Sequence, residues 1–583
     1  MIQNCQVYTP VWTQQLHKAN NFHKHTPPTM TLAATKPLQD FLSPLRTGDS
    51  QLYDVACSFS NVFSDLASSS DDSLFSPVPV TYLPSGRESG RFLAVDVGIT
   101  TLKVAFIDLL GETATRSRSM SNMIRKARHS HVRRTLEKAW RIEDRLKYDQ
   151  PHELFLWIGN CIAEVVKDDL LSSNSTDDAP SHIETGIAFG LPIRQDSLEE
   201  ATLMPTGKGF TIDSDLDLRN SILQGYERHT QRGDDDGERS TKRQRHYALP
   251  KLKITALTND AVATLLSLSY SIKSYPNSRV AMGIVLDEGC NATIPMTLSD
   301  LHPSKSRPIA TREPNAAQTL VSTEWTLHGA AAPLHDHGII TKWDMQLDSQ
   351  SARPGFQPLE YMTGGRYIGE LVRIICHDYF TSILGISERS LPINLVQPYK
   401  LRSDFLITMV STYSSTTTLA ECLNRDMPAP ASSGWTWTGK TASVLREILQ
   451  AVQARSAALV AAATVGLLAS NHEISLRDPR TPPFSHSLLL SCSPSKSFHE
   501  MTFGSRPTDW RGGPEELVVA CIGGVIQQYP KYIENCQRYI DRLVIQCGPQ
   551  EGGKSIFLRE ASDGVIIGAG VLAGMVGQRT KLT

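Results

Sequence analysis

The sequence lacks several features that would assign it to a common class. Its 10 cysteines include no Cys-x-x-Cys pair, so it carries neither a zinc signature nor a short disulfide framework, and we expect a reducing compartment. Its longest apolar stretches, Ala457–Ala469 and Gly564–Gly577, are shorter than the roughly 20 residues that cross a bilayer. We interpret both as buried helices and expect no membrane partner.

Net charge is also nearly absent. The chain has 58 Lys and Arg against 60 Asp and Glu, a formal charge of −2, which excludes whole-chain attraction to nucleic acid or anionic membrane as the main mode of binding. Residues 1–40 lack the apolar core of a secretory signal. We expect the cytoplasm. Mitochondrial association stays open, because no acid precedes Asp40, although the same segment has no Arg.

The composition that is present is that of a large globular protein. Apolar residues make up 40% and charged residues 20% of 583 residues, enough to build a sizeable core. No repeat of solenoid or propeller length is visible, which favours one large fold.

Apolar runs and helical spacing alternate along the chain. Strands are predicted at Phe92–Gly98, Leu102–Leu110, Glu184–Leu191 and Lys253–Thr258, and helices at Asp260–Tyr270 and Arg446–Leu468. The first two strands should form a hairpin with an acid near its bend. This interleaving predicts an α/β protein.

Three segments differ from the rest in composition. Arg116–Lys147 is dense in basic residues and is interpreted as a solvated helix face. Arg232–Arg245 is a charged surface loop, in which the run Lys242–Arg245 leaves nuclear import as an alternative. His472–Gly513 is rich in Pro and Ser and predicts a long exposed insertion.

Two polar turns could carry chemistry. Asp96 ends a strand beside the Gly98 turn, where a carboxylate can hold a hydrated metal and backbone N–H groups can meet phosphate; an ordinary hairpin turn is the alternative. Asn259 and Asp260 lie where a strand meets a helix, the usual mouth of an α/β site, although either could simply cap the helix.

The order of the polar segments resembles the hexokinase family. The matching segments are Pro84–Gly90, Phe92–Lys103, Phe189–Pro192, Gly207–Phe210, Asn259-Asp260, Gly289–Asn291, Thr323–Trp325 and Arg353–Glu370. The last is the most specific, because Arg353–Met362 and Gly365–Glu370 are similar to the family's segment around its second sugar-binding glutamate.

This resemblance implies a two-lobed α/β fold of the actin-like ATPase type that closes over a sugar and ATP. We expect an N-terminal extension at residues 1–76, partly disordered. The small lobe would span residues 77–258, with a charged insertion at 230–246, and the large lobe residues 259–583, with the insertion at 472–513.

The resemblance also implies a sugar site, with glucose as the expected hexose. The matching positions are Lys208, Asn259, Asp260, Asn291, Glu324 and Glu360. Asp260 would be the general base that accepts the proton of the sugar 6-hydroxyl. Two departures are nearby, because Gly190-Leu191 replaces the family's Ser-Phe and Gly207 replaces its Thr.

The nucleotide site departs further from the family pattern. ATP and Mg²⁺ are implied by resemblance, with Asp96 holding the metal through water, at positions Asp96, Gly98, Thr100, Lys103, Gly289 and Gly523. Ile99 replaces a glycine, which predicts backbone strain and a side chain where phosphate should approach. Asp287-Glu288 replaces Gly-Thr, and Ile522 replaces an acid near the adenosine end.

Two carboxylates facing a triphosphate at about 4–6 Å would repel it by roughly 3–4 kcal/mol at an effective dielectric near 20. ATP binding is therefore doubtful, and the chain is predicted to be a weakly active or inactive sugar sensor that regulates carbon metabolism, as fungal relatives with altered nucleotide motifs do. An active ATP-dependent hexose 6-phosphotransferase is the alternative. A third hypothesis is a scaffold that binds only a protein partner.

Overall fold

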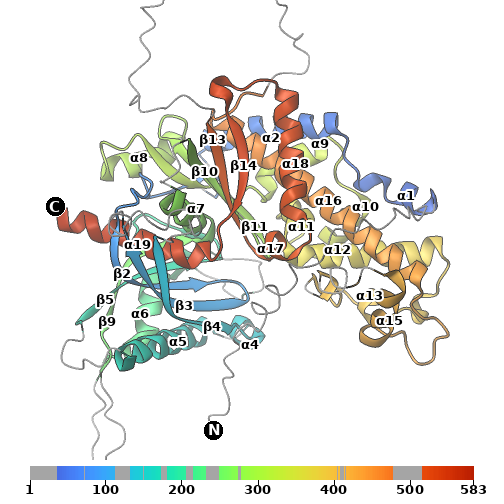
Figure 1. Cartoon of the computed structure of the whole chain (residues 1–583), viewed down its shortest axis with the longest axis horizontal. Coiled ribbons are helices and arrows are strands. Elements are labelled where there is room, and N and C mark those ends of the chain that lie inside the picture. The colour runs from blue at the N-terminus through green and yellow to red at the C-terminus, as the bar shows by residue number, and fades with distance from the viewer. Residues whose placement is uncertain are drawn as a thin grey trace, which may run out of the picture.

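The computed structural model describes residues 36–582 except 71–72, 112–130, 149, 173–179, 205–209, 211–214, 232–247, 273–276, 404, 408–412, 414 and 477–514. Its strands form a six-stranded, a five-stranded and a three-stranded sheet. The two larger sheets are the centres of two lobes (Figure 1). The mixed sheets with their helices confirm the α/β class.

The small lobe is built on the five-stranded sheet, in the order β4-β3-β2-β5-β9. Its elements are β2 (Ser89–Val97), β3 (Thr101–Leu110), β4 (Val132–Arg141), α4 (Asp144–Tyr148), α5 (Pro151–Ser172), β5 (His182–Phe189), β6 (Ile193–Arg194), β7 (Thr202–Leu203), β8 (Leu216–Asp217), α6 (Leu218–Glu227) and β9 (Lys251–Asn259). The predicted hairpin is confirmed, because β2 and β3 pair antiparallel. β5 and β9, also predicted, extend the sheet in parallel.

The large lobe is built on the sheet β1-β12-β11-β10-β13-β14. Its strands are β1 (Ser76–Val78), β10 (Ser278–Leu286), β11 (Cys290–Thr297), β12 (Gln318–Ser322), β13 (Glu516–Ile522) and β14 (Ser555–Glu560). Its helices are α1 (Lys36–Phe41), α2 (Asp49–Ala67), α8 (Pro303–Arg312), α9 (Ala332–Asp336), α10 (Lys342–Ser349), α11 (Pro358–Thr363), α12 (Gly365–Asp378), α13 (Ile393–Val396), α15 (Thr416–Asp426), α16 (Gly439–Ser470), α17 (Gly524–Gln528) and α18 (Tyr532–Cys547).

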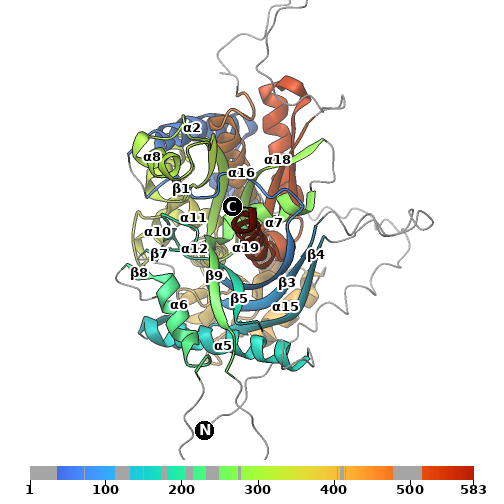
Figure 2. The same ribbon diagram turned by 90° about the vertical axis from the view of Figure 1, so that its left-hand side faces the viewer.

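Two further helices join the lobes. α7 (Asp260–Ile272) packs on the large-lobe sheet, α19 (Gly564–Leu582) packs on the small-lobe sheet, and the two helices pack on each other. Figure 2 shows α19 on one side of the small-lobe sheet, with α5 on the other. Gly568 allows the close approach, because a Cβ there would lie 1.8 Å from the Ala263 carbonyl oxygen. One apolar core therefore runs between the sheets.

The core helix α16 confirms the predicted helix at Arg446–Leu468 and begins earlier, at Gly439, where Thr438 caps it. α16 is long and apolar enough to cross a membrane. However, 89% of its apolar 18-residue segment is buried inside the protein. That burial is typical of a core helix and confirms the interpretation of Ala457–Ala469 as a buried helix.

The predicted division into an extension and two consecutive lobes needs correction at both ends. α2, inside the predicted extension 1–76, buries Phe59 and Phe63 in the large-lobe core and packs along α16. β1, predicted for the small lobe, pairs with β12 in the large-lobe sheet. At the other end, α19 returns to the small lobe. Apolar residues at helical spacing in α2 drive this packing, although Ser and Asp separate them.

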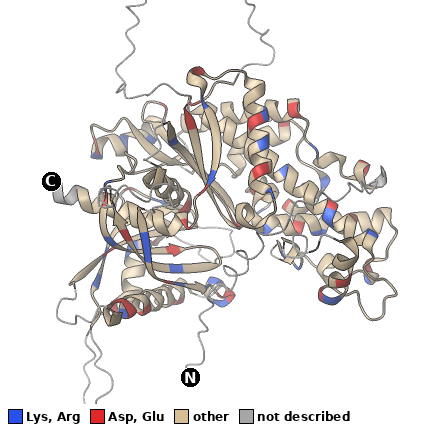
Figure 3. Ribbon diagram, viewed as in Figure 1, with Lys and Arg blue, Asp and Glu red and all other residues tan. Residues whose placement is uncertain are grey.

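The predicted helix face at Arg116–Lys147 is wrong for residues 132–141, whereas the end of the segment, from Asp144, lies in α4. Residues 132–141 form β4, which pairs with β3 at the sheet edge, and exposure alternates from Leu136 to Arg141 as in a strand. Arg133 forms an ion pair with Asp108 at 2.8 Å. Residues 112–130, which include Arg125, Lys126 and Arg128, lie outside the described residues. In the view of Figure 3, basic and acidic residues alternate over both lobes.

The two predicted insertions also fall largely outside the described residues, which stop at 231 and 476 and resume at 248 and 515.

Candidate functional site

A pocket lies between the lobes. Its walls come from five places: the β2–β3 turn, the residues that follow β5, the junction of β9 with α7, the β10–β11 turn with its adjoining strand ends, and Glu324, two residues after β12. The residues lining it are Gly98, Ile99, Gly190, Leu191, Pro192, Asn259, Asp260, Val285, Asp287, Gly289, Cys290, Asn291 and Glu324. Sheet topology therefore joins segments that are far apart in the sequence.

The β9–α7 junction contributes an amide and a carboxylate. Asn259 is the last residue of β9, and its Oδ1 accepts from the Val262 amide at 2.8 Å, so it caps α7. Asp260 begins the helix, and its Oδ1 accepts from the Ala261 amide at 2.8 Å. The capping interpretation of Asn259 is correct, and the same side chain also lines the pocket.

Asn291 and Glu324 form a second polar pair in the pocket. The Asn291 amide donates to Glu324 Oε1 at 2.7 Å, and the Glu324 backbone N–H donates to Asn291 Oδ1 at 3.1 Å. Glu324 has a φ of 48°, a left-handed backbone conformation that is uncommon for a residue other than glycine. The reciprocal bonds and this backbone turn hold the carboxylate at the pocket wall.

Glu360, another predicted sugar position, is not among the residues that line the pocket. Glu360 is only 1% exposed in α11, and its Oε2 accepts from the Cys290 amide at 3.2 Å. Glu360 thus lies directly behind the β10–β11 turn. Lys208 lies outside the described residues.

The β2–β3 turn places Asp96 directly opposite Lys103 in the strand register. Burial raises the pKa of Asp96 to about 7; Lys103 opposes this shift, and Asp287 and Asp563 add to it. Lys103 Nζ lies 3.5 Å from Asp563 Oδ1 at the start of α19. Gly98 and Thr100 belong to the same turn, in which the Gly98 amide donates to the Thr101 carbonyl at 2.9 Å.

The predicted backbone strain at Ile99 is absent, because Ile99 is not among the described non-glycine residues with positive φ. The same prediction places the Ile99 side chain where a phosphate should approach. Ile99 does line the pocket and is 8% exposed. The turn therefore holds a β-branched residue without a left-handed backbone conformation. Ile99 lines the pocket next to Gly98.

The β10–β11 turn holds Asp287 in an unexpected contact. Asp287 Oδ1 accepts from the Gly524 amide at 2.8 Å, at the start of α17. Gly523, one residue earlier, has a φ of 122°, and a Cβ there would lie 2.1 Å from the Leu286 carbonyl oxygen. Only glycine permits this approach, so Gly523 brings α17 onto the turn.

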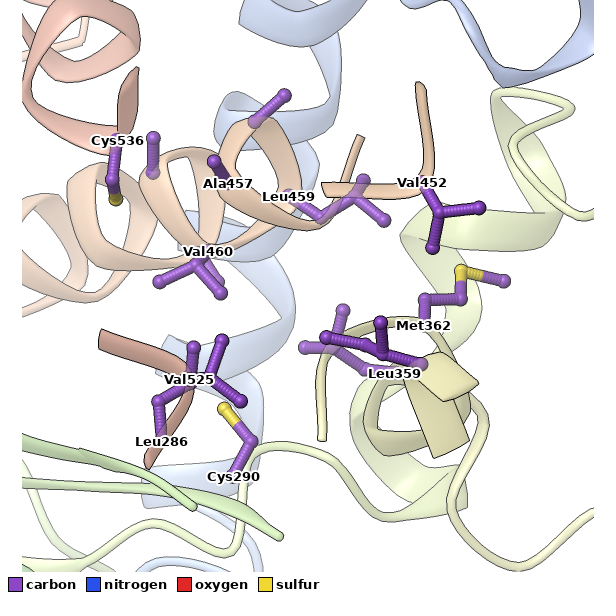
Figure 4. Packing of buried hydrophobic residues seen from close by; sticks show 14 of the residues in the cluster. Leu286, Cys290, Leu359, Met362, Val452, Ala457, Leu459, Val460, Val525 and Cys536 are labelled. Carbon is purple, nitrogen blue, oxygen red and sulfur yellow. The ribbon is translucent and has the colours of Figure 1, made fainter. Parts of the chain in front are cut away.

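Apolar packing also holds the residues on either side of the turn. Figure 4 shows Leu286 of β10 and Cys290 of β11 lying close to Val525 of α17, with Val460 of α16 next to them. The Asp287 carbonyl also accepts from the Gly365 amide at 2.6 Å, at the start of α12. With contacts to both α12 and α17, the turn and the Asp287 carboxylate have little freedom to move.

The two neighbouring acids of the β10–β11 turn differ in their position relative to the pocket. Asp287 lines the pocket, but Glu288 does not. Burial raises the pKa of Glu288, Asp287 adds to the shift, and Arg366, Lys147 and Arg402 oppose it. The two acids therefore have different surroundings, and of the two Asp287 is the one that lines the pocket.

The residue types favour a polyol over a polyphosphate. Carboxylates and amides suit sugar hydroxyls, and carboxylates such as Asp96 and Asp287 suit Mg²⁺. However, the described residues that line the pocket include three acids, Asp260, Asp287 and Glu324, and no Lys or Arg. The fit of this lining to a triphosphate is therefore poor.

The sequence-based prediction missed two features of this site. The Asp287–Gly524 contact joins residues 237 positions apart, and no local pattern announces it. Ser322, which contacts three polar side chains at the pocket, belongs to no motif; its only signal is its place two residues before Glu324 at the end of a strand.

Comparisons with known proteins give a consistent answer. Two family models described as hexokinase match residues 37–270 and 281–575, and the second alone spans more than half of the chain. A hexokinase of Nicotiana tabacum is 24% identical over 542 residues, which cover 92% of this chain and 90% of the relative. A hexokinase of Saccharomyces cerevisiae is 26% identical over 331 residues, 56% of this chain and 57% of the relative.

Solved structures agree on the fold. A Schistosoma mansoni hexokinase complexed with glucose has a TM-score of 0.65 at 20% identity, covering 92% of this chain and 98% of that chain. A second hexokinase crystal structure gives a TM-score of 0.59 with the same identity and coverage. The predicted two-lobed actin-like ATPase fold is confirmed. Relatives come from plants as well as yeast, so a fungal origin stays a prediction.

Proposed function

This chain belongs to the hexokinase family, and from that premise we propose that it binds a hexose, glucose in the first instance, while transferring phosphoryl groups weakly or not at all. In this proposal it acts as a sugar sensor in carbon metabolism. A ligand that binds one arrangement of the lobes better than another shifts the population toward it, which would present a different surface to a protein partner.

The observation that carries the hexose proposal is the convergence of Asn259, Asp260, Asn291 and Glu324 on one pocket. Two amides and two carboxylates can donate to and accept from neighbouring hydroxyls in pairs, which is what a pyranose presents. Asp260 is the candidate general base, since a carboxylate near a sugar hydroxyl can accept its proton during attack on phosphorus.

The acid at the β10–β11 turn supports weak phosphotransfer. Asp287 lines the pocket, is held by the Gly524 amide, and adds to the raised pKa of Asp96. Its negative charge near a triphosphate would be unfavourable, and it occupies a backbone donor that an anion would otherwise use. The nearby cation Lys103 is engaged with Asp563.

An active ATP-dependent hexose 6-phosphotransferase is the second candidate. It is favoured by the position of Glu288, which leaves one opposing carboxylate at the turn where two are predicted, and by the presence of Asp96, Lys103 and Asp260. Magnesium bound between carboxylates could offset part of the remaining repulsion.

Isothermal calorimetry with glucose tests the proposed binding, without nucleotide. The unsubstituted protein should release or absorb measurable heat, and Glu324→Ala should weaken binding by about tenfold or more, because it removes a charged hydrogen-bond partner. Glu388→Ala, at an exposed acid of the large lobe, is the matched control and should bind as the unsubstituted protein does. No heat with glucose would favour the scaffold hypothesis.

A further inference from the structure

The hydrogen-bond geometry points to Ser322 as the residue that positions Asn259, Asn291 and Glu324 for hexose binding. This inference rests on the proposed function, since it names the support of the same site. Ser322 is 6% exposed and does not line the pocket, so it acts through the three side chains that it contacts.

Backbone pairing fixes Ser322 on both sides. It is the last residue of β12, where it is paired with Thr293 of β11 and with Ser76 of β1. A side chain at the end of a strand held between two neighbours has little freedom to shift. Its hydroxyl is therefore a fixed point behind the pocket.

The Ser322 hydroxyl uses its full hydrogen-bonding capacity. It accepts from Asn259 Nδ2 at 2.8 Å and from Asn291 Nδ2 at 3.3 Å, and it donates to Glu324 Oε1 at 3.2 Å. A hydroxyl has one donor and two acceptor positions, and all three are engaged here. The same atom thus connects the ends of β9, β11 and β12.

These bonds determine which way the two amides face. With both Nδ2 groups on Ser322, Asn259 Oδ1 accepts from the Val262 amide, and Asn291 Oδ1 accepts from the amides of Ala292 and Glu324. A flipped amide would place an N–H against a backbone N–H. Ser322 and the backbone therefore select one orientation of each amide before a sugar arrives.

Preorganisation of this kind lowers the cost of ordering side chains on binding. Without the hydroxyl, the Asn259 and Asn291 amides each lose one acceptor and the Glu324 carboxylate loses one donor, so the three side chains are held by fewer hydrogen bonds. The expected consequence is weaker hexose binding from a residue that does not touch the sugar.

Calorimetry with glucose on three full-length variants tests this role. Ser322→Ala should weaken binding by about tenfold to a hundredfold, whereas Ser322→Thr, which keeps the hydroxyl, should stay within about threefold of the unsubstituted protein. Ser456→Ala is the matched control, because Ser456 is also buried and hydrogen-bonded, to Tyr532 in the large-lobe core, and should leave affinity unchanged. Equal affinity of Ser322→Ala and the unsubstituted protein would overturn the inference.

Crystal structures of the unsubstituted protein and of Ser322→Ala, without sugar, give a second readout that does not depend on glucose binding. Altered rotamers of Asn259 and Asn291 in the variant support the positioning role, and unchanged rotamers overturn it. If the unsubstituted protein gives no heat with glucose, the proposed function fails, while the two crystal structures still decide what Ser322 does.

Discussion

At the residue scale, Asp287 has the most direct bearing on nucleotide binding. We predict that Asp287→Asn raises ATP affinity by about tenfold or more, because the charge is removed while Oδ1 can still accept from Gly524. Glu288→Gln is the matched control and should change affinity far less, since Glu288 does not line the pocket. Titration calorimetry with MgATP measures both. Equal effects of the two variants would show that Asp287 has no special position.

The raised pKa of Asp96 predicts how stability depends on pH. Its ordinary value is 3.8 and burial raises the folded value to about 7, so between these pH values the unfolded chain releases a proton that the folded chain retains. The contribution of Asp96 therefore makes the protein less stable as pH rises from about 4 to 7. We predict that the stability gained by Asp96→Asn over the unsubstituted protein grows across that range and is constant above it.

Urea unfolding of both proteins between pH 4.5 and 8 measures this difference. The difference between the two proteins removes contributions that they share and reports on the Asp96 carboxyl. A difference that does not depend on pH would contradict the raised pKa.

The residues of the site could be predicted from the sequence where a motif contains them. The contacts that these residues make could not be predicted. Asn259, Asp260, Asn291 and Glu324 could be selected because their segments resemble the family's motifs, and the junction of a predicted strand with a predicted helix also indicated Asn259 and Asp260. The strain expected at Ile99 did not arise, since the neighbouring turn adopts another backbone conformation. The direction of Glu288 and the contacts of Ser322 depend on elements tens of residues away, which a local pattern does not encode.

At the scale of elements, α2 tests the corrected lobe boundary. Phe59 is fully buried in the large-lobe core between α2 and α16. We predict that Phe59→Ala lowers the free energy of unfolding by about 3–5 kcal/mol, because it leaves a cavity in that core. Asn61→Ala, at an exposed position of the same helix, should stay within about 0.5 kcal/mol.

Denaturant unfolding followed by intrinsic fluorescence compares the two α2 variants. If Phe59→Ala is as stable as Asn61→Ala, α2 does not contribute to the large-lobe core and belongs to an N-terminal extension, as the sequence predicts.

Elements with strong periodicity were predicted correctly, and an edge strand was not. The helices α7 and α16 and the strands β2, β3, β5 and β9 carry clear apolar patterns. β4 is dense in charge, and its strand conformation comes from pairing with β3. Such pairing is a non-local property, so composition alone favoured a solvated helix.

At the scale of the whole molecule, two lobes share one core through α7 and α19. The class and the family were accessible from the order of motifs, whereas the return of the chain's last helix to the small-lobe sheet was not. The pocket between the lobes follows from that topology, because β9 of one lobe continues directly into α7, which packs on the other. The net charge of the chain, −2, does not indicate which ligand it binds. The three acids that line the pocket bear on ligand binding directly.

The most direct test of the central claim is a coupled assay on purified full-length protein with saturating glucose, ATP and Mg²⁺. A protein that binds hexose but opposes the triphosphate should show turnover far below the roughly 1–100 s⁻¹ that is ordinary for kinases. Asp287→Asn, measured in parallel, should raise that turnover. An ordinary rate from the unsubstituted protein would contradict the account and identify the chain as an active hexose 6-phosphotransferase.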